Sequence, residues 1–189
     1  MGRLAEVLVV FVLVVIILSY LRSVYSEVEY VRSNVDGREY LMRHLPDRQQ
    51  AADLIARVNK KLNKLVQHLA AKYPSSQVAM QLYDNYDPGA LSEGGAEVGY
   101  TSYSVNKGEK IVLCVRQRNN ALVDENTVMY VAVHELGHLA TNEVGHTPLF
   151  WKNFKWILEE AISIGLYQRV DYEKHPQKYC GITISSSVV

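Results

Sequence analysis

The sequence has few cysteines, no net charge and no internal repeat, and each absence excludes a class of protein. Cys114 and Cys180 are the only cysteines among 189 residues, which is too few for a disulfide-rich scaffold and the wrong spacing for a cysteine-based zinc site. One disulfide or two free thiols both fit. Lys plus Arg and Asp plus Glu number 20 each, so the chain lacks the overall positive charge typical of nucleic-acid-binding domains. We therefore do not expect nucleic acid as a partner.

Long apolar runs are also absent, apart from one at the N-terminus. The stretch Val7–Leu21 holds 15 residues without a charge, between Glu6 and Arg22, and roughly 17 to 20 apolar residues cross a bilayer. We predict a single-pass membrane anchor over residues 1–22, which places the protein at a membrane without fixing the side. A cleaved signal peptide and a buried core helix are the alternatives.

The remaining chain has the length of about one ordinary domain, and hydrophobic residues make up 48% of the sequence, enough for a core. We interpret residues 23–46 as a linker or stalk, although the turn signal Asp36-Gly37 could also join two short strands. Residues 47–189 are predicted to form the folded domain.

Helical spacing begins at Asp47, which can cap a helix that ends before Pro74. This helix is amphipathic, with an apolar stripe beside a basic face. The face is either solvated or a contact for anionic groups; its residues are Arg57, Lys60, Lys61, Lys64 and Lys72.

The second half of the chain mixes strand and helix patterns. A glycine-rich loop at 84–99 precedes a predicted hairpin, whose second strand is Ile111–Val115. Asp124 or Asn126 can cap a largely apolar helix that runs to about Thr141, and Thr147-Pro148 begins another helix that ends near Gly165. The pattern predicts an α+β fold: a small mixed or antiparallel sheet packed on a central helix with flanking helices.

The central helix carries the motif His134-Glu135-Leu136-Gly137-His138. Histidines four residues apart point from one face of a helix, about 6 Å apart along its axis, so both imidazoles can bind one metal ion. Glu135 lies beside them, where it can take a proton from a zinc-bound water and return it to a leaving amine. The residues therefore predict a Zn²⁺ site, with Glu135 as the catalytic acid and base.

A catalytic zinc site needs a third protein ligand and one open position. His146 is our candidate, because Gly145 lets the chain turn back and the next helix begins directly afterwards. The rival ligands are Glu143, Glu159 and Glu160. Side chains that could stabilise the transition state are left open among Tyr100, Tyr103, Tyr130 and Arg116.

The stretch HELGHLATNEVGHTPLFW, residues 134 to 151, resembles the zinc-peptidase signature of the WLM, SprT-like and related minimal gluzincin-like families. The resemblance implies His134, His138 and His146 as zinc ligands and Glu135 as the catalytic acid and base. It covers roughly residues 82–165. The tail around Pro176 and Gly181 is similar to that of peptidases encoded by large DNA viruses, which suggests a virion-associated or host-membrane location.

Together these observations predict a membrane-anchored zinc metalloendopeptidase that acts on a protein or peptide substrate, in an oligomeric state that the sequence does not give. The substrate would pair as an added strand with Ile111–Val115. The alternative is a membrane-bound structural or interaction protein whose zinc only holds the fold.

Overall fold

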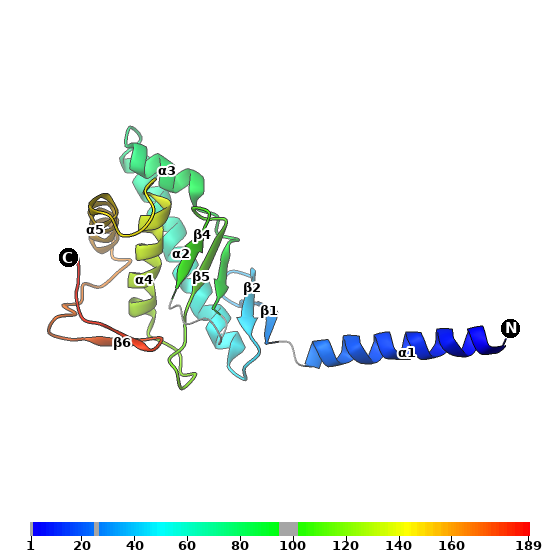
Figure 1. Cartoon of the computed structure of the whole chain (residues 1–189). Coiled ribbons are helices and arrows are strands. Elements are labelled where there is room, and N and C mark those ends of the chain that lie inside the picture. Colours follow the sequence, from blue (N-terminus) through cyan, green and yellow to red (C-terminus); the bar gives the residue numbers. More distant parts are fainter. Residues whose placement is uncertain (1, 25–26, 95–101) are drawn as a thin grey trace.

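A computed structural model describes residues 2–24, 27–94 and 102–189. The chain has an α+β fold with small sheets, and helix α1 projects away from the rest of the molecule (Figure 1). The elements in chain order are α1 (Gly2–Val24), β1 (Val28–Arg32), β2 (Glu39–Arg43), α2 (Arg48–Lys72), α3 (Gln77–Asn85), β3 (Leu91–Glu93), β4 (Tyr103–Val105), β5 (Lys110–Leu113), α4 (Glu125–Leu139), α5 (Pro148–Ser163), β6 (Gln177–Tyr179) and β7 (Ile182–Ile184).

The predicted membrane anchor over residues 1–22 is wrong. Within the described ranges, none of the helices combines the length and the hydropathy needed to cross a bilayer. The physical reason lies in α1 itself, whose uncharged run of 15 residues rises about 22 Å at 1.5 Å per residue. That falls short of a hydrocarbon core of roughly 30 Å. The single-pass membrane localisation is corrected with it.

Residues 28–43 form a hairpin rather than a stalk. β1 and β2 pair antiparallel, and the turn between them contains Gly37 at φ 72°. Tyr40 and Met42 of β2 are buried in the core against α2. The segment lacks a long apolar pattern because each strand has only five residues and successive side chains point to opposite faces of the sheet. The turn signal Asp36-Gly37 was the feature of the sequence that indicated two short strands here.

The central sheet has three strands in the order β3-β5-β4. β3 and β5 run parallel, whereas β5 and β4 are antiparallel, so the sheet is mixed. β5 is therefore the middle strand and β4 the edge strand on the side of helix α4 (Figure 1). Strand β3 falls within 84–99, which we expected to be loop throughout.

Helix α4 lies at the centre, between α5, α2 and the sheet (Figure 1). Asp124 caps its first turn by accepting a hydrogen bond from the Thr127 amide at 2.9 Å, which satisfies one of the free N–H groups there. Thr147 caps α5 in the same way, through the amide of Phe150. The caps agree with the starts that the sequence predicts for both helices.

Candidate metal centre

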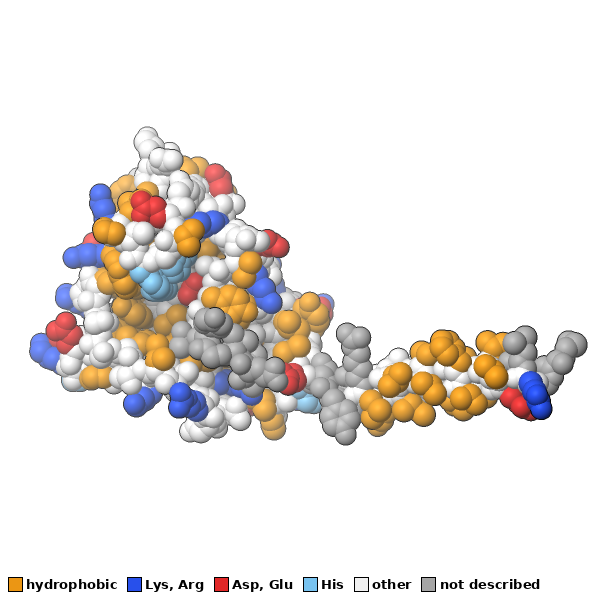
Figure 2. Space-filling model, viewed as in Figure 1, with side chains coloured by type: hydrophobic (Ala, Val, Ile, Leu, Met, Phe, Trp, Pro, Cys, Tyr) orange, Lys and Arg blue, Asp and Glu red, His pale blue; other side chains and the backbone are white. Residues whose placement is uncertain are grey.

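Three histidines that lie apart in the chain meet beside the sheet. The nearest nitrogens of His134, His138 and His146 all lie within 4.8 Å of one another, and the Nε2 atoms of His134 and His146 are 3.0 Å apart. In Figure 2 pale-blue histidine side chains gather in a hollow among apolar ones. This arrangement can hold one metal ion, because neutral imidazole nitrogens are suitable ligands for zinc and other divalent transition metals.

Aromatic rings orient two of these histidines. The His138 ring stacks on Phe150, with ring centroids 4.3 Å apart, and the His146 ring stacks on Trp151 at 5.5 Å. Both aromatic residues belong to the first turn of α5, which begins directly after His146. Gly145 has φ 85°, a left-handed conformation that L side chains rarely adopt. The short turn and the following helix thus fix the position of His146.

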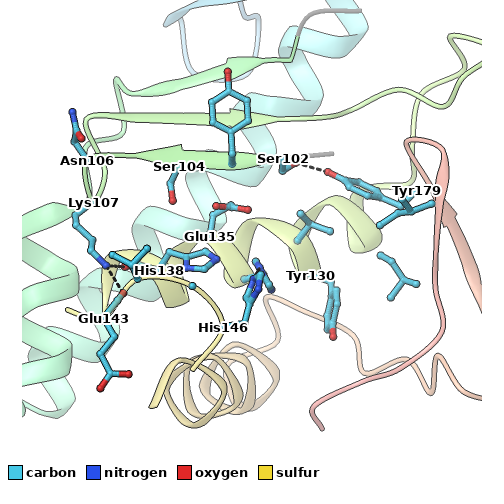
Figure 3. A pocket seen from close by; sticks show the side chains of 17 residues that line it. Ser102, Ser104, Asn106, Lys107, Tyr130, Glu135, His138, Glu143, His146 and Tyr179 are labelled. Carbon is cyan, nitrogen blue, oxygen red and sulfur yellow. Dashed lines mark hydrogen bonds between the residues drawn. The ribbon is translucent and has the colours of Figure 1, made fainter. Parts of the chain in front are cut away.

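The structure does not bring the rival ligands to this point. The Glu143 carboxylate points away from the histidines in Figure 3. Glu160 accepts hydrogen bonds from Lys72 and Tyr73 on α2 and just beyond it, and Glu159 is exposed beside Lys155. Of the candidates that the sequence offered, His146 is the one that completes the cluster.

Burial tunes the acid–base groups of the centre. Burial, together with the neighbouring histidines, lowers the pKa of His134 to about 3, and it lowers the pKa of His138 to about 4. Both imidazoles are therefore neutral near pH 7, with a lone pair available to a metal ion. Burial raises the pKa of Glu135 to about 7, although a hydrogen bond with Ser104 opposes the shift.

The Glu135 carboxylate has one buried oxygen, Oε2, that makes no hydrogen bond to any described residue. A buried acceptor without a partner costs free energy unless something else supplies a donor. An ion held by the three histidines, with a water molecule beside Glu135, would supply it. The residues present therefore fit a divalent metal ion, and a carboxyl group whose pKa lies near 7 suits proton transfer.

These groups open into a cleft of about 700 Å³ (Figure 3). Helix α4 forms one wall, and strand β4 with its turn forms the opposite one. At one end the lining is polar, with Asn106, Lys107 and Glu143; at the other it is mostly apolar, with Tyr130, Val131, Tyr179, Ile182 and Ile184.

The predicted peptide-binding strand requires a correction. Residues 111–115 were expected to accept a substrate strand, but β5 is paired with β3 on one side and with β4 on the other. Its backbone groups are therefore engaged on both edges. Among the described strands, β4 pairs with β5 alone. Residues of β4 border the cleft.

The residues suggested for transition-state stabilisation are scattered. Arg116 is buried away from the cleft, where it binds Glu93 at 2.6 Å and Asp47 at 2.7 Å, and Tyr100 lies outside the described residues. Tyr103 and Tyr130 line the cleft, where the Tyr130 ring packs against Phe154 and Tyr172.

The sequence did not reveal that the C-terminal tail reaches the centre. Cys114 and Cys180 form a disulfide, which places Tyr179 in the cleft wall. The Tyr179 hydroxyl donates to the backbone oxygen of Cys114 at 2.8 Å and is hydrogen-bonded to Ser102 at 2.7 Å. Burial, with the nearby Glu135 carboxylate, raises the pKa of Tyr179. The two cysteines were the signal for this contact, but the spacing left their pairing open.

Part of the basic face of α2 is engaged in ion pairs. Arg57 and Lys61 both bind Glu125, at 2.7 and 2.6 Å, and Lys72 binds Glu160. These pairs fasten α2 to α4 and α5.

Comparison with known proteins finds viral relatives. "Uncharacterized protein R325" of Acanthamoeba polyphaga mimivirus is 34% identical over 169 residues, which cover 87% of this chain and 86% of that protein. The chain belongs to the family of this mimivirus protein. No family model matches the sequence, and no solved structure matches it.

Two further viral proteins are similar to this chain over shorter stretches. "Uncharacterized protein 136R" of Invertebrate iridescent virus 6 is 31% identical over 93 residues, covering 48% of this chain and 51% of that protein. "Uncharacterized protein 042R" of Invertebrate iridescent virus 3 is 38% identical over 84 residues, covering 43% of this chain and 50% of that protein.

Proposed function

We propose that the protein is a zinc-dependent metalloprotease that hydrolyses peptide bonds. One observation carries the proposal: three imidazoles converge beside a buried glutamate oxygen that makes no hydrogen bond to any described residue, in an open cleft. The similarity of residues 134–151 to the WLM and SprT-like signature supports the same chemistry.

His134, His138 and His146 would hold the zinc ion. Bound there, zinc supplies a Lewis acid that lowers the pKa of a water molecule and polarises the carbonyl group of the scissile bond. Three protein ligands leave a coordination position open, as catalytic zinc sites require.

Glu135 would move the proton. Its free Oε2 accepts a proton from the attacking water and returns it to the amine that leaves, which restores the carboxylate. Burial supports this role, because it raises the pKa of Glu135 to about 7. Both protonation states of the carboxyl group are then accessible near neutral pH. Ser104 orients the carboxyl group through its hydrogen bond.

The cleft between β4 and α4 would bind the substrate. A peptide that lies extended in this cleft passes Glu135 and the histidines (Figure 3).

The test combines metal content with proteolysis of an unfolded protein such as denatured casein. We compare the wild type with Glu135→Gln, His146→Ala and, as a matched control, the exposed His175→Ala. We expect one zinc ion per chain and cleavage in the wild type and in His175→Ala. Glu135→Gln should keep zinc and lose cleavage by about 100-fold or more, and His146→Ala should lose zinc affinity.

Two outcomes would overturn the proposal. Zinc binding without cleavage in the wild type would assign the ion a structural role, which was the alternative that the sequence left open. Absence of bound zinc in the wild type would show that the histidine cluster does not hold the metal ion on which the proposed reaction depends.

A further inference from the structure

A small polar hollow lies between two tight turns of the chain, apart from the histidine cleft. One turn spans residues 117–121, where the backbone amide of Gln117 donates to the backbone oxygen of Ala121 at 2.8 Å. The other is the turn of the hairpin formed by β6 and β7. The hollow measures about 380 Å³ and shares none of its described lining residues with the cleft; it is lined by Gln117, Arg118, Asn119, Lys178 and Gly181.

The two turns are fastened to each other, so the hollow is a fixed feature of the fold. The Cys114–Cys180 disulfide joins the hairpin turn to the residue that follows β5. The side chain of Gln117 donates a hydrogen bond to the backbone oxygen of Lys178 at 2.7 Å. The chain itself therefore sets the distance between the two walls.

Gly181 provides the place where the Arg118 side chain lies. A Cβ atom on Gly181 would be 2.5 Å from Nε of Arg118 and 3.0 Å from one of its terminal nitrogens, closer than Cβ atoms approach other atoms in proteins. The guanidinium group can lie against this backbone because glycine has no side chain. Among the described residues the guanidinium group has no hydrogen-bond or ion-pair partner. Its N–H groups are therefore available to a ligand.

The lining of the hollow carries two positive charges and no carboxylate. The Lys178 ammonium group donates one hydrogen bond, to the Thr183 hydroxyl at 3.0 Å, and forms no ion pair with a described carboxylate. The side-chain oxygen of Asn119 accepts from the amide of Ala121 at 3.1 Å, which leaves the NH₂ group of Asn119 as a donor. Together with Arg118, three side chains of the lining thus offer donors.

We propose that this hollow is a binding site for a phosphate group, with Arg118, Lys178 and Asn119 as the donors. The planar fork of a guanidinium group matches two oxygens of a phosphate, and an ammonium group adds a compact positive charge. A dianionic phosphate offers only acceptors, so it complements a lining made of donors. Free phosphate and the phosphorylated side chain of a protein present this same group.

A single hollow is a poor match for a nucleic acid. Binding of DNA or RNA relies on many contacts between cations and successive phosphates. This lining has two cations, on a chain with no net charge. One isolated phosphate group is therefore the ligand that the site favours.

The experiment measures binding to the full chain with its disulfide intact, in a buffer that contains no phosphate. Inorganic phosphate is titrated in a calorimeter, with ionic strength held constant by chloride. A labelled phosphoserine peptide, and the same peptide with serine, are titrated by fluorescence anisotropy. We expect a Kd of about 1 mM or tighter for at least one of the two phosphate sources, and no measurable binding of the serine peptide.

Arg118→Gln is the decisive variant, because Arg118 is exposed and its replacement leaves the core intact. It should weaken binding by about tenfold or more, since charged hydrogen bonds to the phosphate are lost. Arg118→Lys keeps the charge without the fork and should also weaken binding. Lys174→Met is the matched control: Lys174 belongs to the same C-terminal segment but pairs with Asp171 at 2.9 Å, outside the lining, so the affinity should not change.

The outcomes distinguish the two sources and decide on the site itself. Tighter binding of the phosphoserine peptide would identify phosphorylated proteins as the ligand, and tighter binding of inorganic phosphate would identify the free anion. Three results would overturn the inference: no binding of either source, equal binding of the phosphoserine and serine peptides without binding of phosphate, or an affinity that Arg118→Gln leaves unchanged. The last result would place the phosphate elsewhere, for example on a metal ion held by the histidines. Tighter binding of a single-stranded DNA oligonucleotide that depends on Arg118 would also overturn it, because the surface would then serve a nucleic acid.

Discussion

The ammonium group of Lys107 donates a hydrogen bond to the backbone oxygen of His138, with 3.3 Å between nitrogen and oxygen. The same nitrogen also binds the backbone oxygens of Thr141 and Glu143. A cation at this point stabilises the carbonyl end of α4, where the helix dipole is negative. Lys107 thereby joins the turn after β4 to the loop that leads to His146.

We expect Lys107→Met to weaken zinc binding without unfolding the protein. Loss of the three hydrogen bonds frees the segment between His138 and His146, and loss of a group that orients metal ligands typically costs about 10-fold to 100-fold in affinity. Competition with a chromogenic chelator measures the affinity, and circular dichroism reports the fold. Lys60→Met, an exposed change on α2, is the control. An affinity equal to that of the wild type would contradict the positioning role.

Gly137 allows α4 and α5 to approach closely. A Cβ atom at this position would lie 3.0 Å from the ring of Phe150 and 3.2 Å from the Cβ of Phe154. We expect Gly137→Val to lower the free energy of unfolding by about 1 to 3 kcal/mol through overpacking. Because the displaced Phe150 ring supports His138, zinc affinity should fall too.

Urea unfolding and the chelator assay measure the two effects of the Gly137 substitutions. Gly137→Ala should stay nearer to the wild type, since its methyl group is smaller and alanine gains about 1 kcal/mol of helix propensity over glycine. A valine variant as stable as the wild type would show that α5 can move away at no cost.

Removal of the disulfide should destabilise the protein and loosen the cleft wall. Cys114 and Cys180 are 66 residues apart in the sequence, and a loop of that length corresponds to about 4 kcal/mol of unfolded-state entropy in the chain-entropy treatment. We expect the double variant Cys114→Ser, Cys180→Ser to unfold at a correspondingly lower urea concentration. A dithiol reductant should lower the stability of the wild type and leave the double variant unchanged. Equal stability of the oxidised and reduced wild type would contradict this expectation.

Glu160 should make stability depend on pH. Burial tends to raise the pKa of this carboxyl group, but hydrogen bonds from Tyr73, Lys72 and His68 outweigh burial and hold the pKa below its ordinary value. A carboxyl group with a lowered pKa in the folded state stabilises the fold above its ordinary pKa, and this contribution is lost as the pH falls through the lowered value.

We therefore expect Glu160→Gln to reduce the free energy of unfolding by about 2 kcal/mol at neutral pH, where charged hydrogen bonds are lost. The difference from the wild type should shrink toward zero at acidic pH, as urea unfolding at about pH 7 and pH 3 would measure. Glu159→Gln is the neighbouring control, because that exposed residue has only a loose pair with Lys155. A difference that stays constant with pH would contradict the ionic origin of the effect.

Local signals in the sequence were sufficient to predict that the three histidines lie close together. The spacing of His134 and His138 on one helix, and the short tether from Gly145 into a helix start at Thr147-Pro148, are properties of neighbouring residues. They required no knowledge of the rest of the fold. The residues at which α4 and α5 begin follow from the same kind of signal, since an N-capping side chain acts within the first turn of its own helix.

Features that depend on distant residues were missed. Asp47 does not cap α2 with its side chain but binds Arg116, a partner that no local pattern indicates. The strands β6 and β7 have three residues each, too few for a periodic signal, and a disulfide across 66 positions holds them in place. The membrane-anchor prediction failed for a different reason. It relied on the apolar composition of the N-terminal run and gave too little weight to the short length of that run.

Helix α4 is buried along most of its length, with Val128, Met129, Val133 and Leu136 fully enclosed. His134 and His138 are thus held in place by the hydrophobic packing of their own helix, in contrast to the ligands of small domains that fold only on binding zinc. Under the proposed function, a chelator should remove activity and a zinc salt should restore it with no refolding step in between, so that metal supply would set the fraction of competent molecules.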